Sequence, residues 1–239
     1  MRSDGRAHDE LRPFSLEPDF IRGALGSVLV TAGRTRVICT ASLEERTPSW
    51  LEDGGWVTAE YAMLPGATSP RGQRKAGGRA KEIQRLIGRS LRAAVDLSRL
   101  ARADGTGLSF IVDCDVIEAD GGTRTASITG GFVALERALV RLWEAGEIER
   151  IPLLGQVAAV SVGIVGDPPV EVLDLPYEED ARAVVDLNVV RRDDAYVEIQ
   201  GTGEQGTFGR DQLAAMLDLA DAGIARLQAE QRRAMLPLP

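Results

Sequence analysis

The chain has 239 residues, of which 44% are hydrophobic and 27% are charged; these values are typical of a globular protein and exclude a disordered one. Its formal net charge of −8 argues against a surface that binds polyanions everywhere. No apolar run reaches the roughly 18 residues of a membrane span, and residues 1–6 lack the apolar core of a secretory signal, so no membrane association and a cytoplasmic location are predicted.

The single histidine restricts the chemistry that this chain can carry out. Sites built from paired histidines are excluded, and a nucleophile activated by histidine would have to use His8, close to a terminus. The two cysteines, Cys39 and Cys114, lie in alternating apolar stretches and are predicted to be buried thiols. If the protein is an enzyme, we expect carboxylates, arginines and backbone amides to do its chemistry.

The first hundred residues predict strands followed by a helix. Alternating apolar residues predict three strands, at 27–30, 35–41 and 56–64. A turn at 32–34 joins the first two strands as a hairpin, and the stretch 66–78, rich in Gly, Pro, Arg and Lys, predicts a loop. From about residue 80 to residue 100 the apolar residues recur at helical spacing, which predicts an amphipathic helix.

The remainder predicts one long strand, two long helices and a second group of strands. Residues 108–118 alternate strictly, and a helix with one apolar side follows to about residue 146. Four further strands are predicted, at 157–165, 170–173, 184–190 and 196–201. A helical turn is expected at 177–183 and a last helix at 210–231. The pattern predicts a single mixed α/β unit of the α+β type, with halves at about 10–146 and 154–231, in which hairpins outnumber crossover connections.

The junction between the long strand and its helix, residues 120–127, is the strongest candidate for an anion site. Gly121 and Gly122 would let the backbone approach a ligand, and the helix start presents free N–H groups and the positive end of the helix dipole. Arg124 adds a planar set of donors suited to phosphate oxygens. The alternative is an ordinary tight turn in which Thr123 is the helix N-cap.

A strongly basic segment interrupts the acidic chain. Residues 71–102 contain ten basic and two acidic residues, a local charge of +8. Arg79 precedes the predicted helix, and three arginines share one face of it: Arg85, Arg89 and Arg92. Three further cations lie in the loop before it: Arg71, Arg74 and Lys75. The helix face could be merely solvated, or the whole segment could bind the backbone of single-stranded nucleic acid.

Two carboxylates in the second half are candidates for a catalytic role. Asp180 and Asp186 bracket the predicted helical turn and the start of the next strand, so their side chains could converge. Alone, such carboxylates would be structural or solvated. Beside phosphate groups they could instead hold Mg²⁺ or act as a proton donor.

Taken together, these motifs resemble the RNase PH family. The resemblance rests on stretches that occur in order along the chain: DGR at 4–6 with ELRP at 10–13, EIQRLIGR at 82–89, DCDVIEADGGTRTASIT at 113–129, LPYEED at 175–180 and EIQGTGE at 198–204. That family comprises phosphate-dependent 3′→5′ exoribonucleases that trim transfer-RNA precursors. Its fold is a β-α-β arrangement shared with a domain of a small-subunit ribosomal protein, and its working form is a homohexameric ring, a trimer of dimers.

The resemblance also implies roles for single residues. It places the co-substrate, inorganic phosphate, on Arg79, Gly122, Thr123 and Arg124. It places essential carboxylates, which would also hold Mg²⁺, at Asp180 and Asp186. The basic loop before Arg79 corresponds to the loop that grips RNA in the family. Here the sequence departs from the family pattern, because the loop is several residues shorter and Gly66 stands where an arginine often follows Leu-Pro.

Two other functions stay open at this point. A non-catalytic RNA-binding subunit of an exosome-like ring would have the same fold, although Arg124 with Asp180 and Asp186 favours an enzyme. A small-molecule kinase on a similar fold would need a glycine-rich nucleotide loop, which the sequence lacks. The prediction is therefore a reversible phosphorolytic 3′→5′ exoribonuclease that acts on transfer-RNA precursors and other RNA and releases nucleoside diphosphates.

Overall fold

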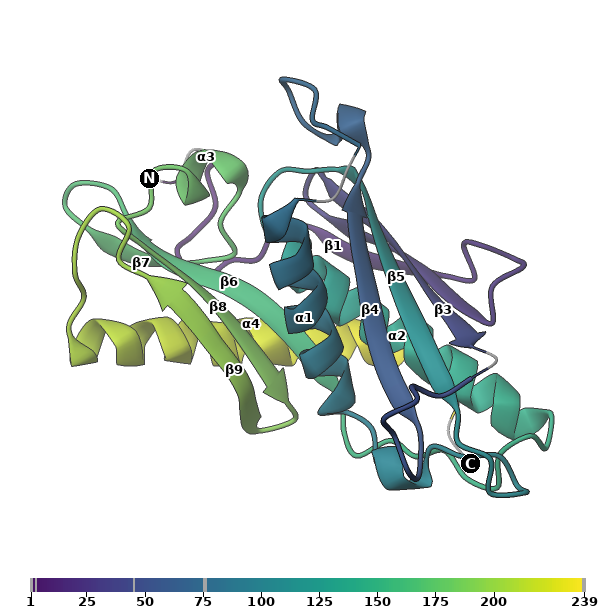
Figure 1. The fold of residues 1–239 in the computed structure, drawn as a ribbon. Coiled ribbons are helices and arrows are strands. Elements are labelled where there is room, and N and C mark those ends of the chain that lie inside the picture. Colours follow the sequence, from purple (N-terminus) through teal and green to yellow (C-terminus); the bar gives the residue numbers. More distant parts are fainter. Residues whose placement is uncertain (1, 3, 45, 75–76, 238–239) are drawn as a thin grey trace.

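The computed structural model describes residues 2, 4–44, 46–74 and 77–237. Within these ranges the strands form one five-stranded and one four-stranded sheet, and long helices pack on both (Figure 1). None of these helices is both long enough and apolar enough to cross a membrane. The predicted mixed α/β fold with a mixed sheet is confirmed.

The first sheet has the strand order β1-β2-β3-β5-β4. Its strands are β1 (Phe14–Pro18), β2 (Gly26–Ala32), β3 (Thr35–Glu44), β4 (Trp56–Met63) and β5 (Ser109–Glu118). All neighbours are antiparallel except β4 and β5, which run parallel and are joined through α1 (Gly78–Arg92). The predicted hairpin of β2 and β3 is confirmed. Cys39 and Cys114 lie opposite each other on β3 and β5 as buried free thiols, also as predicted.

The second sheet is wholly antiparallel and has the strand order β7-β6-β8-β9. Its strands are β6 (Val157–Val165), β7 (Val170–Leu173), β8 (Val185–Arg192) and β9 (Ala195–Thr202). The one-turn helix α3 (Tyr177–Asp180) follows β7 and leads the chain back into β8. This places the short carboxylate-bearing helix at the same end of the sheet as the first residues of β8.

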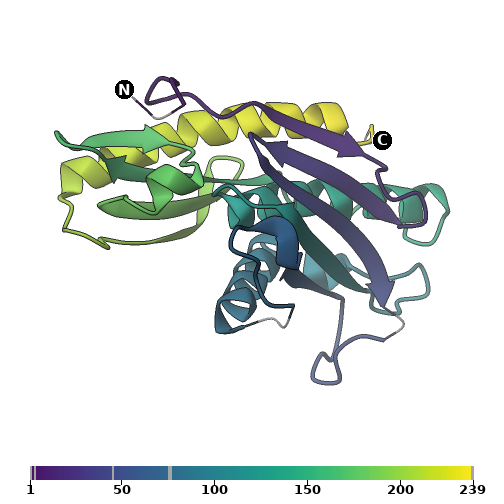
Figure 2. The same cartoon turned by 90° about the horizontal axis from the view of Figure 1, so that it is seen from above.

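Two long helices hold the sheets together. Helix α2 (Thr123–Glu144) buries 17 of its 22 residues because it packs against β2, β3 and β5 of the first sheet and against β6 of the second. A Cβ atom at Gly130 would lie 2.1 Å from Val30, so only glycine lets this helix lie so close to β2. Helix α4 (Arg210–Ala234) runs along one side of the molecule from the second sheet to β1 (Figure 2).

The end of one predicted helix is wrong, and one strand was missed. The helix expected to reach residue 100 ends at Arg92, because the next residues pair with another segment: Val95 forms a β-bridge with Leu153, and the Asp96 amide donates to the Pro152 carbonyl at 2.8 Å. Strand β1 was not predicted. It is an edge strand with mostly exposed residues, and it forms through backbone pairing with β2 rather than through apolar alternation.

A buried carboxylate in α2 yields a test of the packing. The side chain of Glu136 is fully buried; its Oε2 accepts a bond of 3.3 Å from the Leu236 amide, and its Oε1 has no partner among the described residues. Burial raises the pKa of Glu136 to about 7. Between its ordinary pKa and this value the folded state binds more protons than the unfolded chain, so the free energy of unfolding falls as the pH rises through that range.

We expect Glu136→Gln to remove this pH dependence. Between pH 5 and pH 8 the free energy of unfolding of the wild type should fall by roughly 2–3 kcal/mol more than that of the variant. The reason is that the pKa of Glu136 is about 7 in the folded protein and has its ordinary value in the unfolded chain. Urea unfolding across this pH range measures the difference. Glu149→Gln, at an exposed position, is the matched control and should keep the wild-type slope. Equal slopes for Glu136→Gln and wild type would contradict the prediction.

Candidate active site

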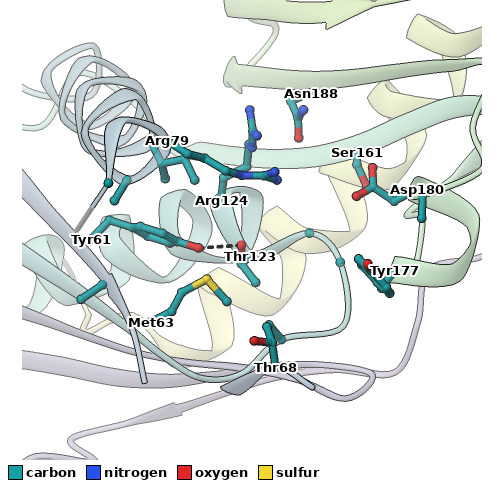
Figure 3. Close-up of a pocket in the computed structure, with 18 of the residues that line it drawn as sticks. Tyr61, Met63, Thr68, Arg79, Thr123, Arg124, Ser161, Tyr177, Asp180 and Asn188 are labelled. Carbon is teal, nitrogen blue, oxygen red and sulfur yellow. Dashed lines mark hydrogen bonds between the residues drawn. The ribbon is translucent and has the colours of Figure 1, made fainter. Parts of the chain in front are cut away.

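A cavity of about 650 Å³ opens between the first turns of α1 and α2 on one side and α3 with β8 on the other (Figure 3). The first sheet contributes Tyr61 and Met63 from β4 to its lining, and the second contributes Ser161, Asp186 and Asn188 from β6 and β8. The cavity therefore exists only where the two sheets meet. It gathers the junction, the candidate cation Arg79 and both candidate carboxylates.

The β5–α2 junction adopts the conformation that its glycines allow. Gly121 and Gly122 have φ of 76° and 65°, in the left-handed region that favours glycine. A Cβ at Gly121 would lie 2.6 Å from the Leu175 carbonyl oxygen, so glycine here accommodates the chain that leads to α3. Helix α2 begins at Thr123 with Gly122 as its N-cap, so the alternative in which Thr123 is the N-cap is wrong. The start of the helix lines the cavity and offers amides that have no partner within the helix.

Two arginines bring positive charge to this cavity. Arg79 comes from the first turn of α1 and Arg124 from the first turn of α2. Arg124 makes only long contacts, 3.4 Å to Oε1 of Gln200 and 3.7 Å to Oε1 of Glu82. Arg79 has no ion pair or hydrogen bond to the described part of the chain that meets ordinary distance limits. Both guanidinium groups can therefore bind an anion without first breaking a strong contact.

Two carboxylates face these cations. Asp180 ends α3, Asp186 is the second residue of β8, and both line the cavity. Burial raises the pKa of both; for Asp186 burial and the neighbouring charge of Asp180 raise it to about 6. Oδ1 of Asp186 is buried and has no hydrogen-bond partner among the described residues. A carboxyl group with a raised pKa and an unpartnered oxygen can hold a proton near neutral pH or bind a cation.

The carboxylate pair fits a magnesium ion in the way that such ions usually bind. Mg²⁺ prefers oxygen ligands and takes one or two protein carboxylates together with water and substrate phosphates. The unpartnered Oδ1 of Asp186 and the carboxylate of Asp180 provide such ligands. No group of three or more acidic, cysteine or histidine side chains in the described ranges could hold a metal by itself. Any ion here would depend on water and phosphate for its remaining ligands.

The other predicted cations are not all brought to the cavity. Arg74 lines it, whereas Arg71 is exposed outside it and Lys75 lies outside the described residues. Arg85 is exposed on α1. Arg89 forms a bidentate pair with Glu198, at 2.6 and 2.8 Å.

Arg92 likewise has partners within the protein. It donates to the Val57 carbonyl at 2.8 Å, and its guanidinium lies 4.5 Å from the centre of the Trp56 ring. The three helix arginines thus share a face of α1 but differ in how far they are free to meet a ligand.

Several residues that line the cavity were missed by sequence reasoning. The hydroxyl of Tyr61 lies 2.8 Å from Oγ1 of Thr123. Asn188 is two residues from Asp186 on β8, and because side chains alternate along a strand this spacing could have revealed it. Ser161 lies opposite Asn188 in the register of β6 and β8, and only that pairing reveals it.

A buried arginine supports the whole arrangement. Arg12 is only 5% exposed; its Nε and Nη2 bind the two carboxylate oxygens of Asp174 at 3.0 and 2.7 Å, and its Nη1 donates to the Asp120 carbonyl at 2.5 Å. The pKa of Asp174 is lowered although burial opposes this, because Arg12 binds the ionised form. The N-terminal segment thus ties the β5–α2 junction to the chain before α3.

A cavity that offers two arginines without short contacts to the described residues, and a helix start opposite two carboxylates, is typical of enzymes that transfer phosphoryl or nucleotidyl groups. Comparison with known proteins agrees with this class. Residues 10–140 match domain 1 of the 3′ exoribonuclease family, and residues 155–223 match domain 2. The chain belongs to this family, the RNase PH family, as its motifs predicted.

Relatives and solved structures are similar along nearly the whole chain. The chain is 51% identical to "Ribonuclease PH" of Bacillus subtilis, over 98% of this chain and 97% of that one. It is 53% identical to "Ribonuclease PH" of Corynebacterium diphtheriae, with the same coverage. Among solved structures, a chain of the Archaeoglobus fulgidus exosome with RNA bound to the active site superposes with a TM-score of 0.82 at 26% identity, over 96% of this chain and 92% of that one.

Proposed function

We propose that this protein is a phosphorolytic 3′→5′ exoribonuclease that trims the 3′ ends of transfer-RNA precursors and acts on other RNA. It transfers the terminal nucleotide to inorganic phosphate and releases a nucleoside diphosphate. The observation that carries the proposal is the cavity in which Arg79 and Arg124 face Asp180 and Asp186. About 50% identity to proteins named ribonuclease PH, over almost the full length, supports the same activity.

Phosphate is the nucleophile of this reaction, so no serine, cysteine or histidine is required. An oxygen of phosphate forms a bond to the phosphorus of the last phosphodiester, the bond from that phosphorus to the 3′ oxygen breaks, and the 3′ oxygen takes a proton. The difficulty is that an anion must approach an anionic diester. Arg79, Arg124 and the amides at Gly122 and Thr123 offset this repulsion and orient the phosphate for attack in line with the departing oxygen.

The carboxylates act on the departing side. Asp186, whose pKa burial raises to about 6, can hold a proton near neutral pH and assists departure of the 3′ oxygen. Asp180 lies in the same cavity and raises the pKa of Asp186 by charge repulsion. Mg²⁺, held by Asp180 and Asp186 when bound, would neutralise part of the phosphate charge. Because a diphosphate replaces a diester, the reaction runs in both directions, and the reverse reaction adds nucleotides from diphosphates.

The basic segment guides the RNA towards the cavity. Arg74 lines the cavity, and Arg71 and Arg85 are exposed cations outside its lining, so all three can contact phosphates of an incoming strand. Lys75, Arg89 and Arg92 complete the proposed RNA contacts. Arg89 and Arg92 would contribute less, because Glu198 and Trp56 already contact their guanidinium groups.

The proposal extends to assembly and location. The solved structures that superpose on this chain include an "Archaeal exosome core", with a TM-score of 0.79 at 25% identity, which supports an assembly of such subunits. We expect a homohexamer built as a trimer of dimers that acts in the cytoplasm. A non-catalytic RNA-binding ring subunit is the alternative. Arg124, Asp180 and Asp186 argue against it, because simple RNA binding gives no reason for two half-buried carboxylates with raised pKa values in the cavity.

The activity is tested by incubating a transfer-RNA precursor with the protein, Mg²⁺ and inorganic phosphate. We expect shortening of the RNA to require phosphate and to release nucleoside diphosphates, which chromatography separates from monophosphates. Equal shortening in phosphate-free buffer with monophosphate products would make the protein a hydrolase. Binding without shortening in either buffer would favour the ring-subunit alternative.

Arg124→Ala tests the phosphate site. Removing one charge-assisted hydrogen bond costs about 1.5–3 kcal/mol, so we expect the KM for phosphate to rise roughly 10- to 150-fold in a folded protein. The measurement is the initial rate against phosphate concentration at saturating RNA. Arg233→Ala removes the same charge from an exposed arginine paired with Glu230 near the end of α4, and it should leave this KM unchanged. An unaltered KM in Arg124→Ala would assign Arg124 a structural role.

A third pair of variants separates RNA binding from chemistry. Neutralising Arg71 and Arg85 should weaken RNA binding, while turnover at saturating RNA stays near wild type. The dependence of RNA affinity on salt should also become shallower, by up to about 0.7 log units per log salt for each arginine that no longer binds an RNA phosphate. Asp186→Asn should bind RNA normally and lose turnover. RNA affinity against salt concentration and saturated turnover are measured for both, with Arg233→Gln as the charge control. Normal RNA binding by the first variant would show that these arginines do not bind RNA, and full turnover by the second would remove Asp186 from the chemistry.

A further inference from the structure

A hydrogen bond at the floor of the cavity carries a further inference, which rests on the proposed function. Tyr61 projects from β4, and its side chain is 4% exposed. Its hydroxyl lies 2.8 Å from Oγ1 of Thr123, the first residue of α2 (Figure 3). No other hydrogen bond of the Tyr61 hydroxyl is found within the described ranges. One shared hydrogen therefore links a buried phenol to a residue of the proposed phosphate site.

The direction of this bond decides what Thr123 can offer to an anion. A threonine hydroxyl has one hydrogen to donate, and an ionised phosphate oxygen can only accept. If Thr123 donated to Tyr61, it would turn oxygen lone pairs towards the phosphate, which would repel it. If Tyr61 donates, the hydrogen of Thr123 is free for the phosphate.

We infer that Tyr61 is a positioning residue for the phosphate site: its hydroxyl donates to Oγ1 of Thr123, so that Thr123 presents its own hydrogen to the bound phosphate. Tyr61 does not touch the phosphate and acts only through Thr123. Burial raises the pKa of Tyr61, which keeps its hydroxyl protonated, and therefore a donor, at neutral pH.

A purely structural role for Tyr61 is the competing explanation, because the ring also belongs to the hydrophobic core of the first sheet. The two roles predict different results for Tyr61→Phe. That substitution keeps the ring and removes only the hydroxyl. If the hydroxyl orients Thr123, the variant weakens phosphate binding while the fold and the RNA site stay intact.

The experiment measures KM for inorganic phosphate, KM for RNA and kcat in Tyr61→Phe. We expect the phosphate KM to rise about 5- to 10-fold, the effect of removing one hydrogen bond, with RNA KM and kcat within about twofold of wild type. Tyr196→Phe is the matched control. It removes a hydroxyl that is bonded to Asp221 away from the cavity lining, and it should change none of these constants.

A double-mutant cycle tests whether the effect passes through Thr123. Thr123→Val removes the acceptor, so adding Tyr61→Phe to it should raise the phosphate KM by less than about twofold further. The inference is overturned by an unchanged phosphate KM in Tyr61→Phe, by an equal rise in both backgrounds, or by a fall in kcat without a change in KM. A wild-type protein that needs no phosphate at all would reject the proposed function itself, which these outcomes leave standing.

Discussion

The contact between Arg12 and Asp174 is the constraint on which the rest of the site depends. Both residues are buried, and Arg12 also binds the carbonyl oxygen of Asp120 at 2.5 Å. Asp120 leads into the start of α2, and Asp174 leads into α3, which ends at Asp180. One guanidinium therefore links the helix start that we propose as the phosphate site to the turn that carries a carboxylate. Burying an ion pair costs the hydration of both charges. In return, this pair links a segment next to the first sheet to a segment next to the second sheet.

The two halves of the chain contribute opposite charges to one cavity. Arg79 and Arg124 come from helices that pack on the first sheet, whereas Asp180 and Asp186 belong to the segment around the second sheet. Neither half contains a complete site. The helices that contact both sheets, α2 and α4, therefore help to hold the cations and carboxylates of the cavity in place. The N-terminal segment serves the same purpose: Arg2 binds Glu179 of α3 with an Nη2–Oε2 distance of 2.6 Å.

Local patterns predicted most of the fold and the place of the site, but not the contacts between distant segments. Strict alternation indicated β5 and apolar spacing indicated α4, because each of these elements buries one face. Apolar spacing also indicated α2, although 17 of its 22 residues are buried. The end of α1 was missed since the β-bridge between Val95 and Leu153 replaces helical turns there. The junction was found from its glycines, yet Gly121 is needed for the approach of the Leu175 carbonyl, which no local pattern reveals. Tyr61 and Ser161 carry no motif and reach the cavity only through strand pairing.

The partners of the arginines distinguish those that support the fold from those that remain available to a ligand. Arg12 and Arg89 have carboxylate contacts at 2.7 and 2.6 Å, and such contacts hold a guanidinium in one place. Arg124 has only a contact of 3.4 Å to an amide oxygen and one of 3.7 Å to a half-exposed carboxylate. An anion that enters the cavity therefore displaces little when it binds Arg124. The net charge of −8, with +8 in residues 71–102, leaves −16 on the rest of the chain, so long-range attraction of RNA is concentrated on the basic segment beside the cavity.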